Sequence, residues 1–302
     1  MEKTNSLQVV QMLQEYIEKN LTKTISLKEL ADFSGYSPWH VGHMFKEISG
    51  KSPYEYIRLR RLTKAALLMR DENIKVIDVA LDFVFDSQEG FTRAFTKEFG
   101  ISPYKYHKQT PPIKLFVPPK VYDNYRALHY VPVKKERMDE VMKTVFVQII
   151  ERPERKCLLK RGKQAKEYFE YCEEVGCDVW NVLTSVKEAL YEPIGMWMPQ
   201  NLRGNTSEYV QGVEVPMGYD KAVPEGYEII VLPPCSMMVF QGEPYEDEKF
   251  SEAIGEVWEH IDKFNPELYG YQWAPEKGPR FQLAPMGYRG YIEARPVQKC
   301  EQ

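Results

Sequence analysis

The sequence lacks three features that would place it in well-known classes of protein. The 302-residue chain contains no apolar run long enough to cross a bilayer. Its first residues, MEKTNSLQVV, lack the charged-then-apolar order of a secretory leader. Its five cysteines form no C-x-x-C pair. These absences predict a cytoplasmic protein with free thiols, no membrane partner, no disulfide framework and no structural zinc site.

Motifs of the common catalytic centres are also missing. No Ser-His-Asp order, H-E-x-x-H pair or phosphate-binding loop occurs along the chain. Cys172 and Cys177 lie close together, but no second pair accompanies them to complete a metal site. We therefore expect no enzyme activity, no catalytic residue, no metal and no cofactor.

The length and the charge of the chain divide it in two. A chain of 302 residues exceeds what one hydrophobic core usually organises, so two domains are expected. Residues 1–110 carry a net charge of +2, whereas the remainder carries -6. The first third is the part whose charge suits contact with DNA.

A short motif occurs twice in that first third. SGKSPYEY at 49–56 returns as FGISPYKY at 99–106. Glycine tolerates the left-handed conformation that ends a helix, and Ser-Pro caps and starts the next one. The motif therefore predicts the end of one helix and the start of another at two places.

The apolar spacing around the motif is helical from residue 7 to 108. We expect two helix-turn-helix units, one before each copy of the motif, joined by a helix that ends at residue 70. Residues 54–70 would span about 25 Å at ~1.5 Å per residue, against roughly 34 Å between major-groove faces on one side of DNA. One chain could thus seat both units on one face of the duplex.

The second unit carries a long and specific pattern. DSQEGFTRAFTKEFGISPYKY at 86–106 resembles the signature of the AraC/XylS family of transcription regulators, and SGYSPWHVGHMFK at 34–46 is similar to the first unit of its MarA and Rob branch. The resemblance implies an all-α DNA-binding domain over residues 1–108. It also implies an activator whose partners are double-stranded DNA and RNA polymerase.

The resemblance assigns base contacts to the outward faces of two helices, opposite Phe45 and Phe95. They are Trp39, Gly42, His43, Gln88, Glu89, Thr92 and Arg93. Arg93 is the strongest candidate, because an arginine-guanine contact discriminates between bases by about 1 to 3 kcal/mol; a surface salt bridge is the alternative. Candidate phosphate contacts, with solvated charge as the alternative, are Lys46, Arg60, Arg61, Lys97, Lys105 and Lys108.

Val84 departs from the family pattern. The family usually has glycine at the turn of the second unit, where the backbone takes a left-handed conformation. A β-branched residue is rarely found at positive φ. The sequence therefore predicts either a strained turn or a rearranged one.

The character of the chain changes after residue 108. Residues 109–143 contain Pro-Pro twice and read as a linker and lead-in. Alternating apolar residues from 144 to 298 predict an α+β domain of two tandem β-α-β-β repeats, with one strand segment at 144–162 and its counterpart at 226–244. This part resembles the GyrI-like effector-binding domain through YVQGVEVP, LPPCSMMVFQGEP and GYIEARPV.

This second resemblance implies a small-molecule effector, amphipathic or aromatic and often cationic, bound in a cleft between the two repeats. Glu214 and Glu293 close the repeats at similar places, so pseudo-symmetry would bring both near the cleft. Pairing of Glu293 with Arg295 or with solvent is the alternative. The full set of candidate ligand contacts is Glu293, Tyr291, Glu214, Trp197, Tyr209 and Trp273.

Two other functions remain open for this domain. Some GyrI-like domains are hydrolases that use a tyrosine and a glutamate, here Tyr209 or Tyr291 with Glu293. A drug-sequestering binding protein is the other possibility. The family often has glutamate at the position of Gln282, which leaves the charge of the ligand undecided.

Overall fold

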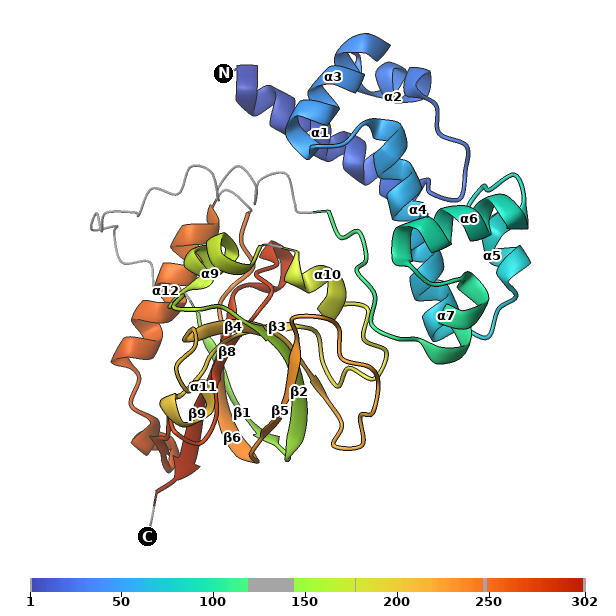
Figure 1. The fold of residues 1–302 in the computed structure, drawn as a ribbon. Helices are drawn as coiled ribbons and strands as arrows, with labels where there is room; N and C mark the ends of the chain where they lie inside the picture. Colours follow the sequence, from blue (N-terminus) through green and yellow to red (C-terminus); the bar gives the residue numbers. More distant parts are fainter. Residues whose placement is uncertain (1, 119–143, 177, 247–248, 301–302) are drawn as a thin grey trace. The chain divides into compact units, whose positions relative to one another are not determined.

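The computed structural model describes residues 2–118, 144–176, 178–246 and 249–300 (Figure 1). The chain divides into two compact units, residues 1–130 and 131–302. The first is helical and the second is built on an antiparallel sheet, which confirms a multidomain chain. Most of the expected linker, residues 119–143, lies outside the described residues, as does Cys177. None of the described helices is both long and apolar enough to span a membrane.

The elements of the first unit are α1 (Glu2–Lys19), α2 (Leu27–Ser34), α3 (Pro38–Ser49), α4 (Pro53–Asp71), α5 (Val76–Asp82), α6 (Gln88–Phe99) and α7 (Pro103–Gln109). Serine caps start α2, α3, α4, α6 and α7. Ser26 accepts a hydrogen bond from the backbone N of Glu29, whose carboxylate accepts one from the backbone N of Ser26, which completes a capping box.

The repeated motif marks the helix ends, as the sequence predicts. Gly50 and Gly100 end α3 and α6 with φ of 73° and 70°. Ser52 and Ser102 then cap α4 and α7, each with proline at the first helical position. Both copies therefore have the same local structure and stop one helix just before the next begins.

Helix α4 belongs to two hydrophobic clusters. Tyr56 and Ile57 in its first half pack with residues of α1, α2 and α3. Leu62 and Met69 further along pack with residues of α5, α6 and α7. One helix thus connects the two groups of helices through its own side chains.

The chain after α7 packs against α4. Ile113 and Leu115 are buried in the second cluster. The backbone N of Phe116 donates to Oγ1 of Thr63 at 2.9 Å, and its carbonyl accepts from Arg60 at 2.6 Å. These residues open the proline-rich stretch that the sequence marks as a linker, and their side chains contribute to the helical unit.

The turn between α5 and α6 holds a valine in the left-handed region. Val84 has a φ of 60°, whereas the turn between α2 and α3 holds Gly35 at 75°. The amide of Phe85 still donates to the carbonyl of Ala80 at 2.9 Å, so the turn closes around Val84. A residue with a Cβ costs about 1 to 2 kcal/mol in this region, so the turn is strained.

Replacing Val84 should therefore stabilise the helical unit. We expect Val84→Gly to raise its free energy of unfolding by about 1 kcal/mol, because relief of strain exceeds the entropy that glycine loses on folding. Thermal unfolding followed by circular dichroism measures the change.

Gly35→Val is the matched control and should lower the stability, since it introduces the same strain into the first turn. An unchanged melting temperature for Val84→Gly, with the control destabilised, would show that the second turn carries no strain.

The second unit is one antiparallel sheet. Its order is β1-β6-β9-β8-β3-β4-β2-β5, and β7 pairs with β9. The order is symmetric about the central β3-β8 pair, since β1, β6, β9 and β8 mirror β5, β2, β4 and β3. The strands are β1 (Phe146–Arg152), β2 (Arg155–Arg161), β3 (Ile194–Trp197), β4 (Tyr209–Val215), β5 (Glu228–Leu232), β6 (Cys235–Gln241), β7 (Tyr271–Trp273), β8 (Arg280–Leu283) and β9 (Ile292–Lys299).

Each long predicted strand is divided at proline. Pro153 separates β1 from β2, and Pro233 with Pro234 separates β5 from β6. Proline cannot donate to a strand ladder, so the pairing stops there. The two pieces then pair in different halves, because β1 lies beside β6 and β5 beside β2.

Helices cover one face of the sheet, here called the helix face. The segment between β2 and β3 contains two short helices, the first ending at Gly176 with φ of 93°. Residues of α9 and α10 pack on β2 and β4, and those of α12 pack on β6. The opposite, inner face of the curved sheet holds a separate core that includes Cys157, Met196 and Met237 (Figure 1). The helices are α9 (Tyr168–Val175), α10 (Val179–Leu183), α11 (Gln200–Arg203) and α12 (Phe250–Lys263), with the short η2 (Pro266–Tyr269) and η3 (Gly287–Arg289).

Candidate functional site

The outward face of α3 is aromatic. Trp39 is 75% exposed, and its ring stacks on that of His43 with centroids 5.5 Å apart and planes 2° apart. Gly42 lies beside them, and a Cβ added there would meet only Leu27 at 4.0 Å. Val41 and Phe45 on the other side of α3 are buried. The three predicted base contacts of this helix thus lie on its accessible side.

The outward face of α6 carries the other predicted base contacts. Gln88, Glu89 and Arg93 are exposed and Thr92 is half-buried. Phe91 and Phe95 on the opposite side are fully buried. Arg93 has no ion pair with another described residue, so its guanidinium is free to contact a ligand.

The predicted phosphate contacts fall into two groups. Four are exposed lysines: Lys46, Lys97, Lys105 and Lys108. Arg60, in contrast, is 9% exposed and donates from Nε and Nη2 to the carboxylate of Glu18 at 2.6 and 2.8 Å. Arg61 donates to the carbonyls of Leu21 and Lys23. The two arginines hold the helical unit together, and the guanidinium of Arg60 is not accessible to a phosphate.

In the second unit, a row of residues crosses the centre of the sheet on its helix face. Gln211 pairs with Gly195, Gly195 with Gln282 and Gln282 with Glu293. Directly paired residues of an antiparallel sheet project to the same face. The row therefore places residues of four strands in one line across the β3-β8 seam, and Gly195 contributes no side chain to it.

Glu293 is fully buried at one end of this row. Its carboxylate forms ion pairs with Arg280 at 2.7 Å and with Arg295 at 2.9 Å. Trp258 of α12 donates from Nε1 to Oε2 of Glu293 at 2.8 Å. The pairing with Arg295 considered from the sequence therefore exists, and a second arginine accompanies it.

Two buried tyrosines are hydrogen-bonded to Gln282. Tyr291 donates to Oε1 of Gln282 at 2.8 Å, and Nε2 of Gln282 donates to the hydroxyl of Tyr209 at 3.2 Å. Burial raises the pKa of both hydroxyls well above the ordinary value, and the charge of Glu293 raises the pKa of Tyr291 further. Both tyrosines are therefore neutral hydrogen-bonding groups at physiological pH.

The other end of the row has an unsatisfied amide. Gln211 is fully buried, and neither Nε2 nor Oε1 of its side chain forms a hydrogen bond of normal geometry with a residue that the structure describes, although its amide lies close enough to the hydroxyl of Tyr209 to interact with it. Buried polar groups of native proteins are almost always paired, by protein, water or ligand. Gln211 is the polar group here that most needs a further partner.

Arg280 lies between two indole rings. Its guanidinium carbon is 4.1 Å from the ring centroid of Trp197 and 5.8 Å from that of Trp258. Trp197 also meets Tyr209 edge-on at 5.0 Å. Beside Trp197 opens a polar hollow of about 460 Å³ whose lining includes Lys163, Lys166 and Glu208. The partly exposed side chain of Arg280 therefore lies between the buried Glu293 and the solvent.

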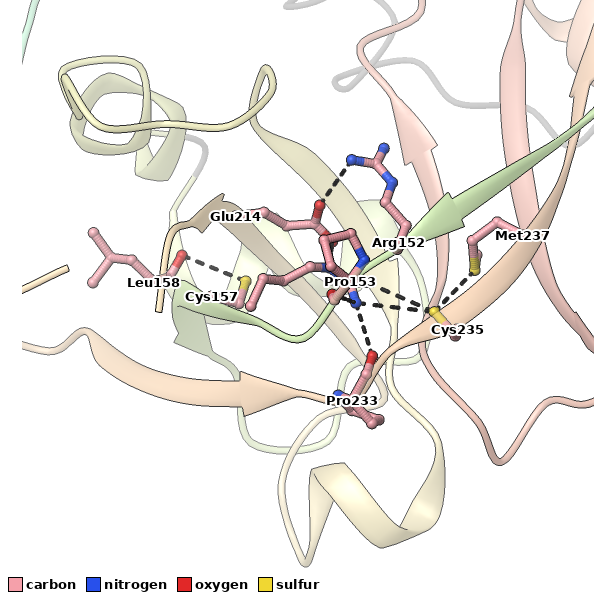
Figure 2. Close-up of polar contacts among 9 residues, drawn as sticks. Arg152, Pro153, Cys157, Leu158, Glu214, Pro233, Cys235 and Met237 are labelled. Carbon is pink, nitrogen blue, oxygen red and sulfur yellow. Dashed lines mark hydrogen bonds and ion pairs between the residues drawn. The ribbon is translucent and has the colours of Figure 1, made fainter. Parts of the chain in front are cut away.

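Glu214 does not belong to this arrangement. It lies three positions from Gln211 on β4, an odd separation, so its side chain projects to the inner face. There it pairs with Arg155 at 2.7 Å and with Arg152 at 3.0 Å, near Cys235 (Figure 2). The expectation that Glu214 and Glu293 share a cleft is wrong, because the strand registers place them on opposite faces of the sheet.

Trp273 lies in the hydrophobic core under α12. It is on β7, paired with Val297, and its ring is 6.2 Å from that of Phe240. It therefore packs beyond the end of the row, away from Trp197. Of the six predicted ligand contacts, the structure brings together Trp197, Tyr209, Tyr291 and Glu293.

Arg280, Gln211 and Trp258 are not among the residues predicted from the sequence. Strand alternation could have found both Arg280 and Gln211. Arg280 lies two residues before Gln282, and Gln211 lies two residues after the predicted contact Tyr209. Trp258 depends on how α12 packs, which the sequence pattern does not specify. Among the described residues, no cluster of His, Cys, Asp and Glu side chains is arranged to hold a metal.

Comparison with known proteins identifies the helical unit. A helix-turn-helix domain model matches residues 30–109. The transcriptional activator AarP of Providencia stuartii is 45% identical over 91 residues, 30% of this chain and 67% of AarP. The multiple antibiotic resistance protein MarA of Salmonella typhimurium is 38% identical over 92 residues, 30% of this chain and 72% of MarA. The Salmonella regulator Rob is 37% identical over 115 residues, 35% of this chain and 40% of Rob.

The helical unit is therefore a helix-turn-helix domain of the class that DNA-binding transcription regulators use. The chain belongs to the AraC/XylS family of transcription regulators, in the branch of MarA and Rob. The match spans about two thirds of the length of AarP and 40% of that of Rob.

Gly195 of the row has no room for a side chain. A Cβ at this position would lie 2.0 Å from the hydroxyl oxygen of Tyr209, whose ring is buried and has little room to move. We expect Gly195→Ala to lower the free energy of unfolding by about 1 to 3 kcal/mol through overpacking. Chemical denaturation measures the change, and near-ultraviolet circular dichroism reports on Tyr209 and Trp197.

Gly255→Ala in α12 is the matched control, because nothing lies within 4 Å of the added Cβ. It should be neutral or stabilising, since alanine favours a helix. Equal stability of Gly195→Ala and the wild type would mean that Tyr209 does not depend on Gly195.

Proposed function

We propose that this chain is a sequence-specific transcription activator controlled by a small amphipathic or aromatic ligand. In this proposal α2 with α3 and α5 with α6 form two helix-turn-helix units that read DNA, and RNA polymerase is the partner. The second unit is a GyrI-like domain of two β-α-β-β repeats that senses the ligand. The whole is a cytoplasmic protein.

The outward faces of α3 and α6 support the DNA-reading part. Each has accessible side chains over a buried apolar side, the arrangement that a recognition helix needs to enter a major groove. In this proposal Trp39, His43 and Arg93 contact bases, and Lys46 and Lys97 contact phosphates. His43 and the open space at Gly42 would set the base preference of the first helix.

The row on the helix face is the observation that carries the ligand-sensing part. It combines aromatic rings with a buried charge and with Gln211, a buried amide whose hydrogen-bonding groups are not fully satisfied by the residues that the structure describes. Ligand sites typically combine aromatic and apolar side chains with a few placed polar groups, and both kinds of group are present here. The symmetric strand order supports a duplicated domain whose halves meet at the row.

A hydrolase would need one of the tyrosines to exchange a proton with Glu293. Tyr291 and Tyr209 are buried with raised pKa values, and Glu293 is held by two guanidiniums. The oxygens of Glu293 are already occupied by Arg280, Arg295, Trp258 and the hydroxyl of Tyr291. We therefore favour binding over catalysis at this position.

The DNA-reading part can be tested with Arg93. We expect Arg93→Ala to weaken binding to the promoter fragment upstream of its own gene by about 5-fold to 150-fold, the equivalent of roughly 1 to 3 kcal/mol. The loss should be much smaller on unrelated DNA. Fluorescence anisotropy at fixed salt concentration measures both.

Lys97→Ala is the matched control on the same helix. Because Lys97 would contact a phosphate, its loss should weaken binding to every DNA sequence alike. It should also reduce the number of counterions released on binding by about one. An Arg93→Ala protein that binds promoter and unrelated DNA as the wild type does would exclude Arg93 as a base contact.

The ligand-sensing part can be tested by thermal shift of the full chain against aromatic amphiphiles of positive, negative and zero charge. A compound at about 100 times its Kd should stabilise the second unit by about 2.7 kcal/mol. Trp197→Ala should remove the effect. Stabilisation by none of the compounds would contradict ligand sensing.

A further inference from the structure

We propose that the site on the helix face binds an anionic aromatic amphiphile, such as an aryl carboxylate, and that Arg280 selects this charge. The inference rests on the proposed ligand-sensing function and specifies the chemical class of its ligand.

The groups around Glu293 carry an excess of positive charge. One carboxylate faces two guanidiniums, those of Arg280 at 2.7 Å and Arg295 at 2.9 Å. The neighbouring hydroxyls of Tyr209 and Tyr291 are neutral, because burial raises their pKa values. The site has a formal charge of one positive unit before a ligand enters, which favours an anion.

Arg280 already occupies the position in which a cationic ligand would bind. A cation is attracted to the face of an indole ring. Here Arg280 occupies that position against Trp197, at 4.1 Å from the ring centroid, and is tied to Glu293 as well. A cationic ligand would have to displace this guanidinium from both its ring and its carboxylate.

Both guanidiniums also have N–H groups that form no hydrogen bond within the described protein. Nη2 of Arg280 and Nε of Arg295 donate to Glu293, whereas Nε of Arg280 lies 2.7 Å from Oε1 of Glu293 without forming a hydrogen bond to it. Their remaining N–H groups donate to no other residue that the structure describes. The side chains are 30% and 25% exposed, so these donors are accessible to the oxygens of a carboxylate.

The hollow beside Trp197 does not itself select the charge. Lys163, Lys166 and Arg203 line it, but Glu208 lines it too and pairs with Arg203 at 2.8 Å. Glu174 and Glu170 accept hydrogen bonds from the backbone of this segment, at Gln164 and Lys166. The positive excess that an entering ligand meets is therefore at Arg280 and Arg295.

The experiment compares three ligands of the same shape on the full-length protein. The probes are 2-naphthoate, 2-naphthamide and 2-naphthamidine, which carry negative, zero and positive charge on one ring system. Isothermal titration calorimetry measures the Kd of each. We expect 2-naphthoate to bind at least 10-fold more tightly than 2-naphthamidine.

Variants connect the preference to Arg280. Arg280→Gln should reduce the ratio of the two affinities at least 10-fold, whereas Arg280→Lys should keep the preference for 2-naphthoate. Arg295→Gln tests the second guanidinium and serves if Arg280→Gln does not fold. Arg289→Gln is the matched control, because Arg289 pairs with Glu192 outside the site, and it should leave the ratio unchanged.

Two results would overturn the proposal in different ways. Binding of all three probes with equal affinity, or tighter binding of 2-naphthamidine, would refute the anion preference and leave ligand sensing intact. Binding of none of the probes, together with no stabilisation by any amphiphile in the thermal-shift screen, would refute both proposals.

Discussion

The pairing of β3 with β8 is the interaction on which the second unit depends. Four residue pairs, from Ile194 with Leu283 to Trp197 with Arg280, join the two halves of the sheet. Every member of the row across the helix face is placed by this register and by the registers of β4 and β9. A slip of one residue would turn each side chain to the opposite face. The same seam brings Arg280 opposite Trp197, so the contact between guanidinium and indole follows from strand pairing.

Each face of the sheet has one buried carboxylate held by two arginines. Glu293 lies on the helix face with partly exposed arginines, whereas Glu214 lies on the inner face with Arg152 and Arg155, both buried. Burying ion pairs costs desolvation, and apolar residues of the same volume are often as stable. The two buried carboxylates therefore say little about stability. They are more informative about what the surrounding side chains recognise or orient.

Much of the helical unit could be predicted from local signals. Serine caps, Ser-Pro starts and glycine ends act within four residues, and the structure has them where the sequence indicates. The left-handed turn at Val84 was predictable because it is a property of one residue and its place in the motif. The roles of Arg60 and Glu18 were not, since 42 residues separate the two partners. The placement of Glu214 and Glu293 depends on strand registers between distant segments, which similar endings of two strands do not determine.

The packing of the chain after α7 matters for where the protein can be cut. The family match ends at residue 109, and a fragment designed from it would stop there. Such a fragment would lose Ile113 and Leu115 from its core, and Arg60 would lose the carbonyl of Phe116. A fragment that ends after residue 117 keeps these contacts. The smallest piece of this protein with a complete interior is therefore longer than its sequence signature.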